Sequence, residues 1–194
     1  MLDMASLVAA LLTACSVKLL DDLLDSGPDD DLYARRAVYC ALALCLACLA
    51  RVATAAPLFL ACYAAGMVFK PEAGMMFRYE TGSRATFARF MEPAAAILVL
   101  VACCGPVTGA AALLLASFAQ LADDVLDFTA DLGARPANLA HRFGVVECAL
   151  AGTSCLLTAG CLEPRLAASA LAGAVAVWAI EWALARREEG GTGD

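Results

Sequence analysis

Long apolar runs recur along nearly the whole 194-residue chain, and they constrain its fold more than any other feature. The runs cover residues 4–20, 37–56, 57–69, 91–104, 106–122, 145–162 and 165–185. A helix of about 20 apolar residues crosses the roughly 30 Å hydrocarbon core of a bilayer, and several runs reach that length. We therefore predict an all-α, polytopic transmembrane bundle of about seven helices, folded as a single domain over residues 1–194 within a lipid bilayer.

The composition excludes several other classes of protein. Hydrophobic residues make up 62% of the chain and charged residues only 17%, which leaves too little polar surface for a soluble globule. The net charge of −7 would repel nucleic acid, so no nucleic-acid partner is expected. The 10 cysteines all lie inside apolar runs, where free thiols act as small packing residues.

The distribution of basic residues predicts the orientation. With seven crossings, the ends of the first, third, fifth and seventh runs lie on one side of the membrane. Of the 13 basic residues, only Arg51 and Arg165 then fall on the other side. Because cytoplasmic loops carry an excess of Lys and Arg, we expect the N-terminus outside and the C-terminus inside.

Two acidic segments lie at the ends of the first and fifth runs. Residues 21–29 and residues 123–131 both read D-D-x-x-D-x-x-x-D. In a helix the i, i+4 spacing stacks Asp21 over Asp25, and Asp123 over Asp127. A 3-4-3-4 stripe of polar residues that begins in the fifth run is expected to point into the bundle, because polar atoms that face lipid would be unsatisfied. Its members are Ser117, Gln120, Asp124, Asp127 and Asp131.

This placement of carboxylates predicts a metal site. The C-terminal end of a helix is already negative, and like charges at i, i+4 repel each other, so two such clusters need positive charge between them. Hard oxygen ligands suit Mg²⁺, which is typically bound by a few carboxylates together with substrate phosphates. The alternative is that these carboxylates are solvated helix ends. The predicted ligands, which together equal the net charge of −7, are Asp21, Asp22, Asp25, Asp123, Asp124, Asp127 and Asp131.

The two motifs resemble those of the UbiA superfamily of intramembrane prenyltransferases, N-D-x-x-D-x-x-x-D and D-x-x-x-D-x-x-x-D. Residues 21–29 match the first motif with Asp21 in place of Asn, and Asp123, Asp127 and Asp131 match the second. The segment 133–144 is similar to the family's loop that ends in a Leu-Ala-x-Arg-Leu-Gly pattern. The resemblance covers the two motif helices and this loop.

The resemblance implies a Mg²⁺-dependent prenyltransferase. It would move an allylic prenyl group from a prenyl diphosphate to a hydrophobic acceptor in the membrane, with the active site on the cytoplasmic face of a bacterial or archaeal cell membrane. Metal ions and cationic side chains would stabilise the leaving diphosphate. The expected catalytic residues are Lys70, Arg78 and Tyr79, in a loop that would cap the site, and the expected substrate-binding residues are Lys18, Arg135, Asn138 and Arg142.

Two other functions stay open, and so do the roles of two single residues, Lys18 and His141. An intramembrane terpene cyclase of the same fold would quench the cation within its own chain, and a divalent-cation transporter would use the Asp clusters for coordination. Lys18 would contact phosphate or pair with Asp22 at i, i+4. His141 would shuttle a proton or lie at the surface. Glu181, between two tryptophans of the last run, is expected to be structural and near the interface.

Overall fold

The computed structural model describes residues 3–26, 32–69, 83–128 and 138–190, and all regular secondary structure in these ranges is helical. Five helices, α1, α2, α4, α6 and α7, are long and apolar enough to cross a membrane. The apolar part of α3, Met91–Cys104, is shorter. The prediction of an all-α protein with membrane-spanning helices is confirmed at this level. The helices are α1 Met4–Ser26, α2 Tyr33–Phe69, α3 Ser83–Cys104, α4 Pro106–Leu126, α5 Leu139–Phe143, α6 Val145–Leu162 and α7 Pro164–Gly190.

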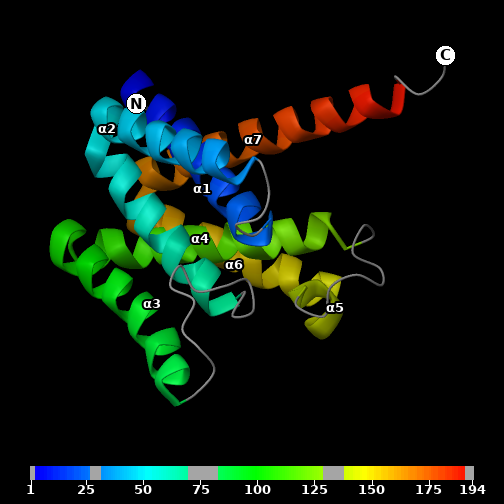
Figure 1. Ribbon diagram of the computed structural model, residues 1–194. Coiled ribbons are helices and arrows are strands. Elements are labelled where there is room, and N and C mark those ends of the chain that lie inside the picture. Colours follow the sequence, from blue (N-terminus) through cyan, green and yellow to red (C-terminus); the bar gives the residue numbers. More distant parts are fainter. Residues whose placement is uncertain (1–2, 27–31, 70–82, 129–137, 191–194) are drawn as a thin grey trace.

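The second and third apolar runs form the two halves of α2, which bends sharply at Arg51 (Figure 1). Arg51 has φ −164° and ψ 96°, so its backbone is extended and interrupts the helix. The sequence placed this boundary at Pro57, but Pro57 lies inside the second half of α2 and is buried. A charged side chain is costly in hydrocarbon, so a bend at Arg51 keeps the charge at one end of the bundle.

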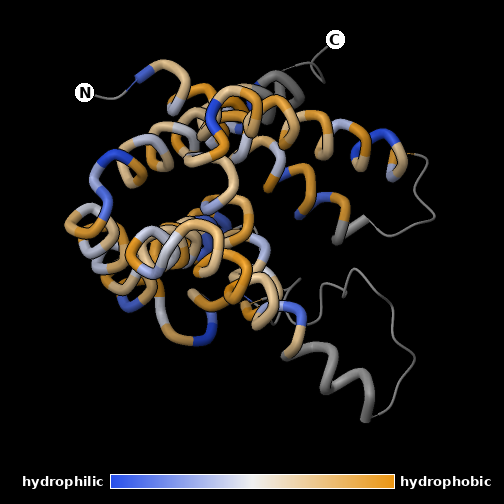
Figure 2. Tube along the Cα trace, turned by 90° about the vertical axis from the view of Figure 1, so that its left-hand side faces the viewer, coloured by the Kyte–Doolittle hydropathy of each residue, from blue (hydrophilic) through white to orange (hydrophobic). Residues whose placement is uncertain are grey.

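The helices pass back and forth between two ends of the bundle (Figure 1). α1 packs most extensively against α2 and also contacts α7, whereas α4 packs against α6. Large apolar side chains are exposed on the outside, among them Leu49 (83%), Leu98 (70%) and Leu157 (66%). Figure 2 shows this hydrophobic character along most of the helical trace. Such a surface is suited to lipid.

The interior is built mainly from small residues, which allow helix backbones to approach closely. Most of the buried apolar residues are alanines. A Cβ atom added to Gly173 of α7 would lie 2.9 Å from the backbone carbon and oxygen of Ala10 in α1. At Gly152 of α6 an added Cβ would lie 3.5 Å from Leu121 and 3.6 Å from Phe118 of α4. Close glycine contacts therefore fix α7 against α1 and α6 against α4.

Two glycines form the tight connections between helices. Gly105 (φ 86°) joins α3 to α4, with Pro106 as the first residue of α4. Proline suits that position because the first backbone N–H groups of a helix have no partner within it. Gly144 (φ 105°) joins α5 to α6, and positive φ is easily reached only by glycine. The Gly105-Pro106 pair separates the fourth and fifth apolar runs of the sequence, and such a pair is typical of a turn.

Candidate active site

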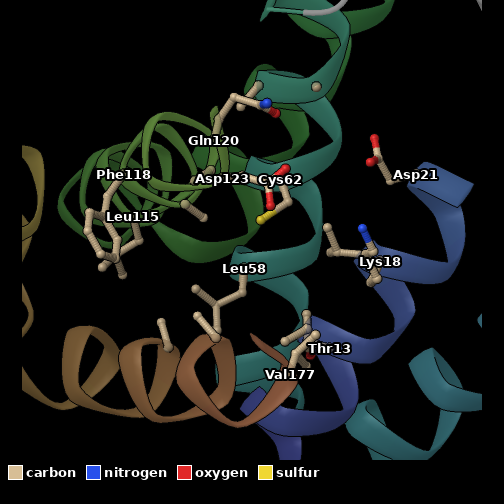
Figure 3. A pocket seen from close by; sticks show the side chains of 18 of the residues that line it. Thr13, Lys18, Asp21, Leu58, Cys62, Leu115, Phe118, Gln120, Asp123 and Val177 are labelled. Carbon is tan, nitrogen blue, oxygen red and sulfur yellow. The ribbon is translucent and has the colours of Figure 1, made fainter. Parts of the chain in front are cut away.

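A cavity of about 190 Å³ lies between α1, the second half of α2, α4 and α7. Figure 3 shows Thr13, Leu58 and Val177 on one side of it, and Asp21 and Gln120 on the opposite side. The Thr13 hydroxyl donates to the carbonyl of Ala9 within its own helix (2.7 Å). The cavity therefore has an apolar end and a polar end, which is the usual pattern of a small-molecule site. We call the polar end the mouth.

One carboxylate from each acidic motif lies at the mouth. Asp21 is in the last turns of α1 and Asp123 is in the last turns of α4, and both line the cavity (Figure 3). Gln120, one turn before Asp123 on α4, lines the cavity as well. The fold thus brings two motifs that are distant in sequence to the same end of one cavity.

Lys18 lies among the acidic groups of the mouth. Its Nζ atom is 3.3 Å from Oε1 of Glu181 on α7 and 3.9 Å from Oδ1 of Asp22 on its own helix. It also interacts electrostatically with Asp123 of α4. The i, i+4 pair with Asp22 that the sequence suggested is confirmed, and the pair with Glu181 adds a link between α1 and α7.

Asp124 faces away from the mouth and supports α5. The residue is 8% exposed, and Oδ2 accepts a hydrogen bond from the backbone N–H of Leu139 (3.0 Å), while Gln120 donates to Oδ1 (3.5 Å). We expected Gln120, Asp124 and Asp127 to point into the bundle together. Gln120 lines the cavity and Asp124 is buried, but Asp127 is exposed because it is the C-cap, where α4 has ended. Asp123 lines the cavity whereas Asp124 contacts α5, because consecutive helical residues point about 100° apart.

Asn138, expected to bind substrate, is the N-cap of α5. Its Oδ1 accepts hydrogen bonds from the backbone N–H groups of Ala140 (2.8 Å) and His141 (3.3 Å). Its Nδ2 donates to the backbone carbonyl of Asp124 (3.0 Å). The side chain is buried, so in this structure Asn138 joins α5 to the end of α4.

The remaining predicted residues of this region lie at its surface. Asp127 is the C-cap of α4 and is exposed. The exposed Arg142 has its guanidinium carbon 5.3 Å from the centre of the Phe143 ring. His141 is exposed and stacks on Phe128, with 4.4 Å between ring centres. In this structure Arg142 and His141 are therefore surface residues of α5 that contact aromatic rings.

Several predicted site residues lie outside the part of the chain that the structure describes. Asp25 belongs to α1, but its side chain is not among the described ones. Five more predicted site residues belong to segments 70–82 and 129–137, which lie outside the described residues, so their roles remain predictions. They are Lys70, Arg78, Tyr79, Asp131 and Arg135.

Two acidic residues of this region were not assigned to the site by sequence reasoning. Glu181 lines the cavity and pairs with Lys18, although we expected it to be structural. Glu92 of α3 has a buried Oε2 atom without a hydrogen-bond partner among the described residues, and it interacts electrostatically with Tyr63, which lines the cavity. The signal for both is an ionisable residue inside an apolar run, which marks a functional position by default.

The opposite end of the bundle carries two polar links. Arg51, at the bend of α2, donates to the Asp3 carboxylate before α1. A hydrogen bond from the Ser6 backbone lowers the pKa of Asp3, and the Arg51 guanidinium lowers it further. Thr108 of α4 donates to Glu163, between α6 and α7 (3.0 Å). Arg51, Asp3 and Glu163 are thus each hydrogen-bonded to a neighbouring segment at this end of the bundle.

No protein-family model, no curated protein and no solved structure matches this chain.

Proposed function

We propose that this chain is a Mg²⁺-dependent intramembrane prenyltransferase related to the UbiA superfamily. It would move an allylic prenyl group from a prenyl diphosphate to a hydrophobic acceptor dissolved in the bilayer. One observation carries the proposal: Asp21 and Asp123, from two separate acidic motifs, line the polar mouth of a cavity that is otherwise mainly apolar. A substrate with a charged head and a hydrocarbon tail matches that division.

The carboxylates at the mouth fit Mg²⁺ by the chemistry of their donor atoms. Mg²⁺ prefers oxygen ligands and is usually held by one or two carboxylates plus substrate phosphates. Among the residues with described side chains, no three Asp, Glu, His or Cys groups form a metal cage. Asp21 and Asp123 would therefore hold the ion together with the diphosphate. Bound Mg²⁺ would neutralise part of the negative charge on the leaving group.

The chain's own side chains would orient the substrate and shield the reaction from water. Lys18 at the mouth would donate hydrogen bonds to the diphosphate, and Gln120 would offer its amide. Trp178, Phe118 and Tyr63 line the cavity, and aromatic rings attract a cation through their faces. They would thus stabilise positive charge on the allylic carbon.

The proposed reaction exchanges one bond for another. The bond between the allylic carbon and oxygen breaks, and its electron pair leaves with the diphosphate. The acceptor forms the new bond to carbon and releases a proton, which a carboxylate at the mouth would accept. The resemblance to the UbiA superfamily implies that side chains from adjacent loops would help to stabilise the leaving diphosphate. These residues are Lys70, Arg78, Tyr79 and Arg135.

We also propose an orientation for this site. The mouth would face the cytoplasm of a bacterial or archaeal cell, with the N-terminus outside and the C-terminus inside. The support for this is the asymmetry of the basic residues, of which only Arg51 and Arg165 fall on the opposite side in the expected topology. A soluble diphosphate head would then reach the carboxylates from the cytoplasm.

The test is diphosphate release by the purified full-length chain in lipid nanodiscs. Labelled prenyl diphosphates of several lengths would be supplied with and without Mg²⁺, together with a lipid extract as the source of acceptor. We expect Mg²⁺-dependent release and a loss of about 10²-fold in Asp21→Asn and in Asp123→Asn. Glu147→Gln is the matched control, because Glu147 is an exposed carboxylate near the start of α6 and does not line the cavity. Equal release by all variants would refute the assignment.

Cyclisation is the second candidate, favoured by the aromatic side chains that line the cavity. A cyclase would release diphosphate and produce a free hydrocarbon or alcohol without any acceptor. Analysis of the lipid-soluble product by mass spectrometry therefore separates the two enzymes. A divalent-cation transporter would instead move Mg²⁺ into vesicles without consuming any prenyl diphosphate.

A further inference from the structure

Lys18 and Glu181 form an ion pair between two apolar helices. Both residues lie within segments long and apolar enough to cross a membrane, Met4–Leu23 and Pro164–Ala183. Charged residues are costly in such segments and are retained mainly where they serve a function. Both side chains line the cavity, and their nitrogen and oxygen atoms are 3.3 Å apart. The pair is therefore part of the mouth rather than of the outer surface.

The packing of α1 on α7 determines where this pair forms. Gly173 lies directly against the backbone of Ala10, so the two helices are in close contact there. Lys18 and Glu181 each follow that contact by eight residues, roughly 12 Å along each helix. The contacts advance in the same direction along both helices, which are thus parallel at the cavity. The ion pair then links α1 to α7 at its mouth.

Several carboxylates lie around Lys18 among the described residues. Glu181, Asp22 and Asp123 all interact with the single ammonium group, and Asp21 lines the same mouth. Lys18 is 38% exposed and Glu181 is 39% exposed, so neither side chain is enclosed by the helices around it. An ammonium group has three donors on a flexible stem and can exchange one anionic partner for another. A diphosphate entering the mouth would compete with Glu181 for Lys18.

We propose that Glu181 is a positioning residue that holds Lys18 at the mouth when no substrate is bound, and that the prenyl donor's diphosphate takes its place on Lys18. This inference rests on the proposed function and adds to it a role for an acidic residue outside the two motifs. The motif carboxylates recruit the diphosphate through metal, whereas Glu181 occupies the lysine until the diphosphate displaces it. Displacing Glu181 costs part of the binding energy, so Glu181 raises the KM for the donor.

The test compares KM and kcat for the prenyl diphosphate in Lys18→Gln, Glu181→Gln and the double variant. Since Gln keeps the shape of Glu but cannot hold the ammonium by charge, we expect Glu181→Gln to lower KM several-fold with little change in kcat. Lys18→Gln should raise KM about tenfold or more. The double variant should match Lys18→Gln alone, because Glu181 acts only through Lys18. Glu147→Gln, outside the cavity, should leave KM unchanged.

Three results would overturn the inference. An unchanged or raised KM in Glu181→Gln would mean that Glu181 only supports the fold. A lowered KM in the double variant relative to Lys18→Gln would mean that Glu181 repels the diphosphate directly. Calorimetric binding of inorganic diphosphate with Mg²⁺ provides a readout without turnover, and tightening in Glu181→Gln is required. If the wild type turns over prenyl donors but these shifts are absent, the proposed function stands and this inference fails. If the wild type turns over none, both fail.

Discussion

The contact between Gly173 and Ala10 makes a sharp prediction about how α7 is held against α1. A Cβ atom at position 173 would lie 2.9 Å from the backbone carbon and oxygen of Ala10, and 3.2 Å from the backbone nitrogen of Leu11. Real Cβ atoms essentially never come closer than 3.0 Å to such atoms, and a helix backbone cannot rotate away as a side chain can. In Gly173→Ala, α7 must therefore move away from α1.

The magnitude follows from overpacking, which typically costs about 1–3 kcal/mol. Alanine also favours the helix over glycine by about 1 kcal/mol, and this gain must be removed from the comparison. Gly160→Ala is the control that measures this gain alone, because Gly160 is also helical and an added Cβ would meet nothing within 4 Å. We therefore expect Gly173→Ala to be about 1–3 kcal/mol less stable than Gly160→Ala.

Reversible unfolding in mixed micelles with increasing denaturing detergent would measure this difference. A gap of 1.4 kcal/mol corresponds to about a tenfold change in the ratio of folded to unfolded protein. Gly173→Ala should also weaken the Lys18–Glu181 pair, since both residues follow the contact on the same two helices. Equal free energies of unfolding for the two alanine variants would show that α7 and α1 do not meet at Gly173, and would remove the basis for the register of the ion pair.

Three further predictions concern the helix connections. Gly144→Ala should destabilise the protein by about 1–3 kcal/mol in the same unfolding assay, because its φ of 105° is strained for any residue with a Cβ. Asp124→Ala should cost about 1–3 kcal/mol, since it leaves a backbone N–H of α5 without its acceptor, whereas the exposed Asp127→Ala should stay within about 0.5 kcal/mol of wild type. The hydrogen bond from the Ser6 backbone lowers the pKa of Asp3 below 3.8, so its stabilisation is present above that pH and is lost as the pH falls through the lower folded-state pKa. Asp3→Asn should lack this component of acid sensitivity, and parallel melting curves from pH 5 to 2 would test it; identical pH dependence would contradict it.

The all-helical class, with helices long and apolar enough to cross a membrane, followed from the sequence because it depends on composition and run length. Apolar runs of the right length gave the helices, and the Gly105-Pro106 turn followed from local chemistry. The bend at Arg51 instead of Pro57 was missed, because a proline near a helix start and a charged residue both interrupt apolar runs. Arg51 also contacts Asp3, 48 residues away in sequence, and no local pattern indicates such a contact.

The candidate site was predictable in part for a similar reason. The acidic pattern identified Asp21 and Asp123, but it could not separate Asp123 from its neighbour Asp124. That distinction depends on where α5 docks, and α5 is a five-residue helix held by the Asn138 cap. Glu181 lies more than 150 residues from Lys18, so no local pattern indicated their pairing.

The direction of the helices explains why the motifs meet at all. Along the cavity, α1 contributes residues from Ala10 to Asp21 and α4 contributes residues from Leu115 to Asp123. Both helices have their acidic residues in the final turns, so parallel passage places both groups at one end and leaves the early turns to form the apolar end. An antiparallel arrangement of the same helices would separate the carboxylates by the length of the cavity. The charge of the mouth is therefore a consequence of topology, since the two halves of α2 and then α3 return the chain to the end of the bundle where α1 began, before α4 starts.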